Sequence, residues 1–174
     1  MILNHEFNET TYRANQQLFY DVAYAKINSQ KKKSFITGII LLALGTAIVI
    51  GKDAIGYVFI AFGLLSLFAG YILNKNTKTA KKKVDRYVSD YVVAARGQLI
   101  YWEVNDNFIK YKDFKVDVTL QWSSVSAYEI IKNTLIIYTD IALTLIYSED
   151  EMSTGQFAET ISLLKSKVGD PKKR

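Results

Sequence analysis

Residues 34–51 of this 174-residue chain read SFITGIILLALGTAIVIG, and residues 54–73 read AIGYVFIAFGLLSLFAGYIL, with no charged residue in either stretch. As helices they would be about 27 and 30 Å long, close to the hydrocarbon thickness of a bilayer. Helices that are apolar all round must be buried in a large core or in a membrane. Because the rest of the chain is too short and too polar to cover both, the sequence predicts a hairpin of two transmembrane helices.

Only Lys52 and Asp53 separate the two stretches. A charged side chain at the centre of a membrane helix costs about 2.5–3.5 kcal/mol, so this pair predicts the turn at the far face of the membrane. The outer flanks of the hairpin are basic, and cytoplasmic flanks carry an excess of lysine and arginine. Both termini are therefore expected in the cytoplasm. The candidate membrane-surface contacts are Lys31, Lys32, Lys33, Lys75, Lys78, Lys81, Lys82 and Lys83.

Positive charge lies beside the apolar block rather than on the C-terminal part of the chain. The whole chain has a net charge of +5, yet residues 98–174 carry nine basic and eleven acidic residues. A nucleic-acid-binding module would need a basic patch on its folded domain, so this distribution favours the lipid bilayer as partner and argues against nucleic acid. The lysines either bind anionic headgroups or, more simply, only fix the topology.

Glycines recur every seven residues within the apolar stretches. This spacing keeps small residues on one seam of a left-handed helix pair and lets two backbones approach closely. We interpret the seam as the contact between the two helices; general glycine enrichment in membrane helices and self-association of the chain are the alternatives. Neither stretch has an internal ionisable residue, which argues against a channel or transporter. The candidate helix-packing residues are Gly38, Gly45, Gly56, Gly63 and Gly70.

The segments on either side of the hairpin are predicted to be largely helical. In residues 1–33, a short strand at 2–7 is followed by Asn8 or Thr10, either of which could cap a helix reaching about Ile27. In residues 74–97, apolar positions recur at three- and four-residue spacing, which predicts a basic helical extension. Gly97 is expected to end it. The one histidine, His5, is expected to be structural rather than catalytic.

Residues 98–174 are predicted to form antiparallel strands followed by a helix, which makes the fold class α+β. Alternation from Phe114 to Trp122 predicts a half-buried strand with Trp122 in the core. Ser153 and Gln156 match a capping box before the terminal helix. A curved sheet or partial barrel, with the helix over its open side, is the expected domain. The strands are expected at residues 98–104, 108–112, 114–122, 125–131, 134–140 and 141–147.

Two apolar spans, then strands, a Trp-Ser-x-Val segment at Trp122, Ser123 and Val125, a hairpin and a terminal helix resemble the YcxB-like family of bacterial membrane proteins. The resemblance covers most of the chain and rests on hydrophobic patterns. It implies a location in the bacterial cytoplasmic membrane and a pleckstrin-homology-like fold for residues 98–174. Many relatives carry a proline before the last helix, where this chain has Tyr147-Ser148-Glu149. The resemblance supplies no catalytic residues.

Residue types with catalytic chemistry are scarce in this chain. There is no cysteine, which excludes thiolate nucleophiles and zinc–thiolate sites. The acidic residues are scattered, and the one acidic run, residues 149–151, is explained by its place near a helix N-terminus. We expect a non-enzymatic protein, without cofactor or metal, whose cytoplasmic domain binds a protein partner. The alternatives are an envelope-stress or bacteriocin-immunity type membrane protein and a sensor of anionic lipid headgroups.

Overall fold

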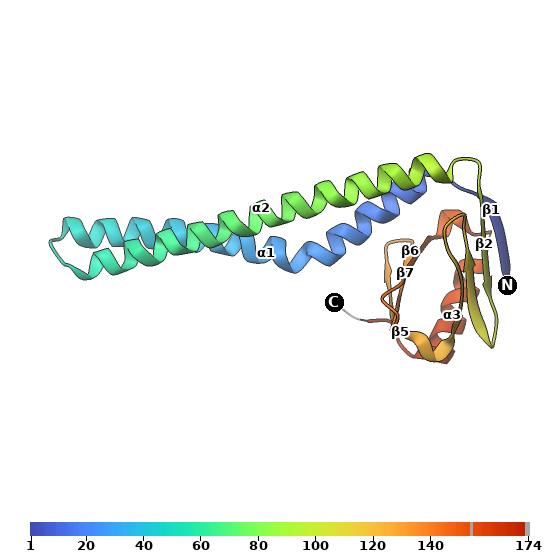
Figure 1. Ribbon diagram of the computed structural model, residues 1–174. Coiled ribbons are helices and arrows are strands. Elements are labelled where there is room, and N and C mark those ends of the chain that lie inside the picture. Colours follow the sequence, from blue (N-terminus) through green and yellow to red (C-terminus); the bar gives the residue numbers. More distant parts are fainter. Residues whose placement is uncertain (154, 173–174) are drawn as a thin grey trace. The chain divides into compact units, whose positions relative to one another are not determined.

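The computed structural model describes residues 1–153 and 155–172 (Figure 1). Two long helices, two antiparallel sheets and a C-terminal helix make an α+β fold, as predicted. The chain divides into two compact units, one of Met1–Phe19 and Val88–Arg174, the other of Tyr20–Tyr87. We call these the β unit and the helical unit. This division differs from the ranges expected from sequence, because the N-terminal strand belongs to the same unit as the other strands.

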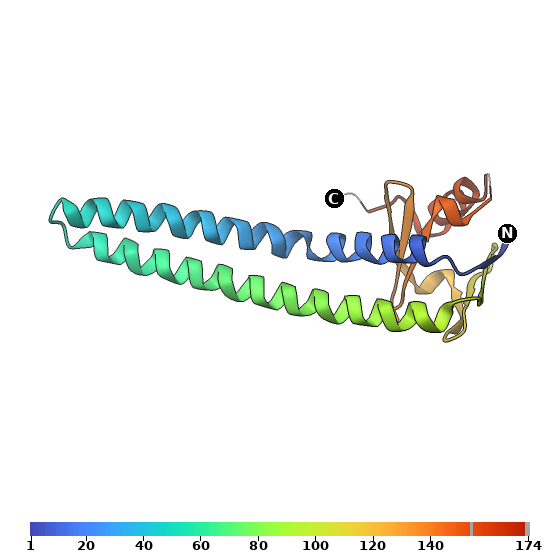
Figure 2. The same ribbon diagram turned by 90° about the horizontal axis from the view of Figure 1, so that it is seen from above.

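The helical unit is an antiparallel pair formed by residues 20–50 of α1 (Glu9–Ile50) and residues 55–87 of α2 (Ile55–Ala95) (Figures 1 and 2). Asp53 accepts a hydrogen bond from the Ile55 N–H at 2.9 Å, and Lys52 adopts a positive φ of 66°. Lys52 and Asp53 therefore form the turn between the helices, as their charge predicted.

Both long helices continue beyond the apolar stretches, and α2 includes the predicted helical extension up to Ala95. The predicted end of an N-terminal helix near Ile27 is wrong, because α1 runs through this position to Ile50. Neither glycine nor proline occurs in residues 8–37 or 71–96, so no residue there breaks the helical hydrogen bonds. Both helices are long and apolar enough to cross a membrane, and little of either apolar window is buried.

The β unit contains two antiparallel sheets. The four-stranded sheet has the order β1 (Ile2–Glu6), β2 (Leu99–Val104), β3 (Phe108–Lys112), β4 (Asp117–Gln121). The three-stranded sheet has the order β5 (Val125–Ile131), β6 (Thr134–Thr139), β7 (Thr144–Ser148). Within residues 1–153 and 155–172 no strand pairing joins the two sheets, so they do not form a closed barrel.

The terminal helix α3 (Gln156–Val168) packs against the core of the β unit through its apolar side. Leu164 is fully buried, and Phe157 and Val168 contact the core. The predicted capping box does not cap α3, whose N-cap is Gly155, although Gln156 Oε1 accepts the Ser153 N–H at 2.9 Å. The fully buried core side chains include Trp102, Val104, Ile109, Leu135 and Ile137.

The prediction of a strand from Phe114 to Trp122 is partly wrong. Only Asp117–Gln121 is strand, because the Asp113 carboxylate accepts the N–H groups of Lys115 and Val116 and holds the preceding residues in a turn. Phe114 is 41% exposed. Trp122 begins the short 3₁₀ helix η1 (Trp122–Ser124) and lies partly buried at the edge of the core, where its Nε1 donates to the carbonyl of Asn105 at 3.0 Å.

Candidate functional site

The glycines of the predicted seam lie where α1 and α2 come closest. A Cβ built on Gly45 would lie 2.7 Å from the carbonyl oxygen of Gly56, and one on Gly56 would lie 2.6 Å from that of Gly45. Because real Cβ atoms do not approach a backbone oxygen this closely, the two helices can meet here only through glycine.

The same arrangement continues along the pair. A Cβ on Gly38 would lie 3.0 Å from the carbonyl oxygen of Gly63, and one on Gly70 would lie 3.2 Å from the ring of Phe35. The seam thus lies inside the pair, and large apolar side chains lie outside it. Those more than half exposed include Ile36, Ile39, Ile40, Ile50, Ile55, Tyr57, Phe62, Leu64, Leu65, Phe68 and Tyr71.

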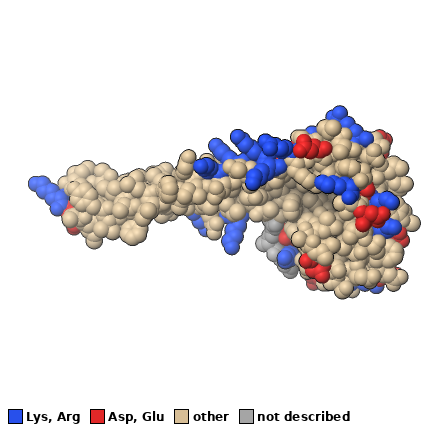
Figure 3. Space-filling model, in the orientation of Figure 1, with Lys and Arg blue, Asp and Glu red and all other residues tan. Residues whose placement is uncertain are grey.

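The eight candidate lysines lie on the helical unit at different heights. Because Gly70 packs against Phe35, residues 31–33, one turn before Phe35, are level with residues 71–73 of α2. Along α2, residues 81–83 lie about 12–15 Å beyond Leu73. Figure 3 shows basic side chains gathered on this part of the helices, and a long stretch without charged atoms between them and the far turn. The lysines therefore form a column along the helices rather than one ring.

The β unit holds the outer ends of α1 and α2 on two neighbouring strands. β1 pairs with β2 from Ile2↔Glu103 to Glu6↔Leu99, and the Phe7 N–H donates to the carbonyl of Gln98 at 2.9 Å. In the sequence, the helical hairpin is therefore inserted between β1 and β2, two strands that pair directly with each other.

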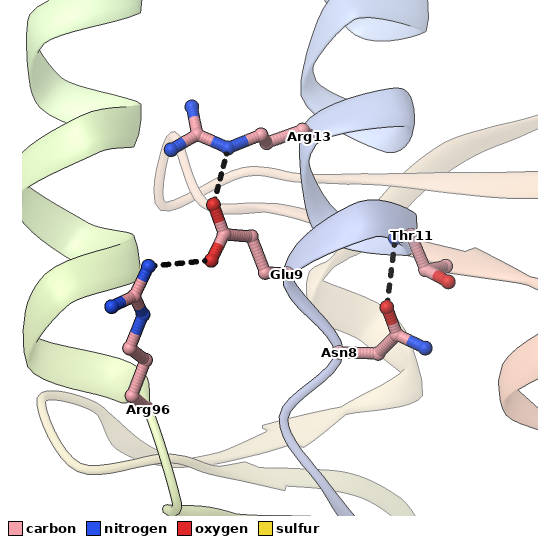
Figure 4. A network of polar contacts seen from close by, with 5 residues as sticks. All are labelled: Asn8, Glu9, Thr11, Arg13 and Arg96. Atoms are coloured by element: carbon pink, nitrogen blue, oxygen red, sulfur yellow. Dashed lines mark hydrogen bonds and ion pairs between the residues drawn. The ribbon is translucent and has the colours of Figure 1, made fainter.

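A charged network joins the helix ends beside these strands (Figure 4). The Glu9 carboxylate accepts hydrogen bonds from Arg13 at 2.9 Å and from Arg96 at 3.0 Å. Both guanidinium groups lower the pKa of Glu9. Asn8 Oδ1 accepts the Thr11 N–H at 3.1 Å, which confirms Asn8 as a cap of α1. Because the side chains of Glu9, Arg13 and Arg96 are all at least 36% exposed, these pairs contribute little stability.

Aromatic rings from the same helix ends pack against one another. Tyr12 of α1 stacks on Tyr91 of α2 with ring centroids 4.6 Å apart, and Phe7 lies 5.3 Å from Tyr12. The ring of Phe114 lies 5.1 Å from that of Tyr91. Aromatic contacts of this kind contribute about 0.5–1.5 kcal/mol each beyond the burial of their area. They make the first turns of α1 and the last turns of α2 part of the β unit's core.

Asp113 anchors this aromatic group from the four-stranded sheet. Its Oδ2 accepts the hydroxyls of Tyr91 and Tyr111, each at 2.6 Å. Burial alone would raise the pKa of Asp113, but the hydrogen bonds from both tyrosines and from two backbone N–H groups lower it overall. Burial raises the pKa of both tyrosines, and the hydrogen bonds to Asp113 raise it further. At neutral pH both tyrosines are therefore protonated and donate to a charged carboxylate. These hydrogen bonds fix the positions of the Tyr91 and Tyr111 rings.

A second partly buried carboxylate, Glu151, lies at the end of the short helix η2 (Glu149–Glu151). Its Oε2 accepts the Ser148 N–H at 2.9 Å and the Asn15 side-chain amide at 3.1 Å, so it binds α1 to the strand β7. Burial raises the pKa of Glu151, and hydrogen bonding and the nearby His5 lower it less. Among the residues that the structure describes, the ring nitrogens of His5 and the hydroxyl of Tyr147 are buried without a hydrogen-bond partner.

Sequence reasoning missed both carboxylates. Asp113 was one of several scattered acidic residues, and Glu151 was assigned with its neighbours to a helix N-terminus. A signal existed for Asp113, because an aspartate between two predicted strands is typical of an Asx turn, in which its carboxylate accepts the N–H of the residue two positions later. No such signal existed for Glu151, whose partner Asn15 is 136 residues away.

The described residues contain no group of three or more His, Asp or Glu side chains that could hold a metal ion. Neither a protein-family model, nor a curated protein, nor a solved structure matches this chain. The chain combines an apolar helix pair with a glycine seam, a column of lysines, and a β unit that includes the outer ends of both helices.

Proposed function

We propose that this chain is a non-enzymatic integral membrane protein whose α1–α2 hairpin anchors a cytoplasmic binding domain. The observation that carries the proposal is the apolar surface of the helical unit. Between residues 34 and 73 the only charges are Lys52 and Asp53 at the turn, and the large apolar side chains are exposed to the surroundings. Exposure of so much apolar surface to water would be strongly unfavourable, whereas lipid tails would cover it.

The orientation follows from the charges at the two ends of this surface. Residues 20–33 and 74–87 together carry ten basic and two acidic residues, a net charge of +8, whereas the turn carries one of each. An excess of lysine and arginine favours the cytoplasmic side. Both termini are therefore proposed to lie in the cytoplasm of a bacterial cell.

The β unit is proposed to be a pleckstrin-homology-like module, and the chain a YcxB-like protein. A four-stranded sheet, a three-stranded sheet and a terminal helix in chain order support this fold. The unit carries eleven basic and fourteen acidic residues, a net charge of −3. An acidic domain is repelled by an anionic membrane surface, which favours a protein partner over lipid for this unit.

Cysteine labelling tests the anchoring, because the chain has no cysteine of its own. Lys52→Cys places a thiol at the turn, and Asn133→Cys places one at the exposed turn between β5 and β6. A membrane-impermeant maleimide should label the first variant in intact cells and the second only after permeabilisation. Labelling of both variants in intact cells, or release of the protein from membranes by an alkaline wash, would contradict the proposal.

The binding role is tested by affinity capture of the full chain in mild detergent, beside a chain of residues 9–97 alone. The shorter chain omits β1 as well as residues 98–174, because β1 has no pairing partner without β2. A partner captured by the full chain and absent from the shorter one would support a protein-binding domain. A partner captured equally by both would assign the interaction to the hairpin instead.

A further inference from the structure

The two apolar stretches end at different heights on the two helices. Ser66 Oγ donates to the carbonyl of Ser34 at 2.9 Å, and Gly70 packs against the ring of Phe35. Going outward from the turn at residues 52–53, the first charged residue of α1 is Lys33. It lies beside the last turn of the α2 apolar stretch, which continues to Leu73. Residues 31–33 therefore lie level with apolar side chains of α2, among them Tyr71 and Ile72, which are 57% and 40% exposed.

Two groups of basic side chains, residues 31–33 and residues 81–86, lie at opposite ends of this region, and Lys75 and Lys78 of α2 lie between them, about 3 and 8 Å beyond Leu73. The polar layer on each side of the hydrocarbon core is only about 5–8 Å thick. If the anchoring proposed above holds, residues 31–33 lie at the boundary between hydrocarbon and this layer, because residues 71–73 of α2 are still apolar. The second group, residues 81–86, begins about 12 Å beyond Leu73, which is past the layer.

The second group is also partly neutralised within the helical unit. Lys81 pairs with Asp85 at 3.2 Å, and its ammonium lies 5.0 Å from the centre of the Tyr20 ring. Among the described residues no carboxylate lies within ion-pair distance of residues 31–33, and Lys32 and Lys33 are exposed. Lysine stems can lie along apolar surface while their ammonium groups reach charged lipid groups.

We propose that residues 31–33 of α1 and the exposed Tyr71 and Ile72 of α2 form a binding site for an anionic phospholipid of the cytoplasmic leaflet. Ammonium groups of this run pair with the lipid phosphate, and an acyl chain packs on the apolar side chains at the same height. The proposal rests on the membrane anchoring and assigns the lipid class that the anchor selects. It also gives residues 31–33 a role that residues 81–83 do not share.

The test compares two variants that lose the same number of positive charges. One replaces Lys31, Lys32 and Lys33 with Gln; the control replaces Lys82, Lys83 and Arg86, which are exposed and lie beyond the headgroup layer. Each full-length protein is reconstituted in a mixture of phosphatidylglycerol and phosphatidylcholine, extracted in mild detergent, and its retained lipids are quantified by mass spectrometry. The first variant should lose its enrichment for phosphatidylglycerol by about fivefold or more, and the control should keep it.

Two results would overturn the lipid site. Equal losses in both variants would mean that the whole basic column attracts anionic lipid without a site, and no loss in the first variant would mean that residues 31–33 serve topology alone. The membrane anchoring is tested separately by an alkaline wash of membranes that contain the unchanged chain, and release of the protein would contradict it. Maleimide labelling of Asn133→Cys in each variant checks that the orientation is the same.

Discussion

Asp113 and Glu151 are both partly buried carboxylates of the β unit, yet their surroundings shift the pKa in opposite directions. Asp113 receives four hydrogen bonds, two of them from tyrosine hydroxyls, which outweigh its burial and lower its pKa. Glu151 concentrates its hydrogen bonds on one oxygen, Oε2, and burial dominates. The balance between burial and donated hydrogen bonds therefore decides whether the charge of each carboxylate stabilises the fold.

Asp113→Asn should lower the stability of the β unit by about 2 kcal/mol at neutral pH, because an amide cannot accept all four hydrogen bonds. The folded-state pKa is lowered, so this contribution is complete above the ordinary carboxyl pKa of about 4 and is lost as the pH falls through the lower folded value. Denaturant unfolding from pH 7 down to pH 3 measures it. Asp117→Asn, which removes only an exposed pair with Lys112, is the control and should change little.

Glu151→Gln should stabilise the protein at neutral pH. The glutamine oxygen can replace Oε2 and keep the bonds from Ser148 and Asn15, while the charge that burial disfavours is removed. Because the folded-state pKa is raised, the gain should be largest above that pKa and should vanish below the ordinary glutamate pKa of about 4.3. Thermal melting at several pH values measures it. A loss of stability at neutral pH would mean that the hydrogen bonds to the charged carboxylate outweigh its burial.

At the scale of elements, the helix pair depends on backbone contact rather than on interlocking side chains. Gly45 and Gly56 each face the carbonyl oxygen of the other, so a side chain at either position can be accommodated only if the helices separate. Gly51, by contrast, has only carbonyl oxygens of its own helix end near its Cβ position. The glycines of the hairpin thus differ in what they tolerate.

Gly45→Leu and Gly56→Leu should each destabilise the pair by about 1–3 kcal/mol, the usual effect of overpacking at a tight contact. Gly51→Leu is the matched control and should have a smaller effect. Unfolding of the purified protein in mild detergent by increasing dodecyl sulfate, followed by circular dichroism, measures the difference. Equal effects at all three positions would mean that the close approach at Gly45 and Gly56 does not hold the pair together.

The sequence located most elements but not their long-range partners. Alternation placed β2, β3, β5 and β6 within one residue of their observed bounds, and the seven-residue glycine repeat marked residues that the structure brings into contact. The pairing of β1 with β2 had no local signal, because Glu6 and Leu99 are neighbours only in space. Trp122 was assigned to a strand from alternation alone, which cannot register the turn imposed by Asp113.

At the scale of the whole molecule, the helical unit is an insertion within an otherwise continuous β fold. The parts of α1 and α2 that belong to the β unit contribute core side chains, among them Val92 and Ala95, which are almost completely buried. Residues 20–87 contribute no strand to either sheet. The β unit therefore contains everything that its two sheets and its core require.

Replacing residues 20–87 with a flexible glycine-serine linker should give a soluble, folded β unit, because residues 1–19 and 88–172 keep all seven strands. Size-exclusion chromatography should report a monomer, and hydrogen exchange should protect the amides of β1 and β2. An aggregated product, or a β1 without protection, would show that the helical unit is needed to bring the two strands together.

The insertion between β1 and β2 also fixes the order of events during synthesis. The ribosome makes β1 first, and its partner β2 follows only after both long helices, more than 90 residues later. At ordinary translation rates this interval lasts about 5–20 s. β1 therefore stays without its partner strand until both long helices have been synthesised, and the four-stranded sheet can form only after that. A β unit with a closed four-stranded sheet therefore shows that both long helices have been synthesised.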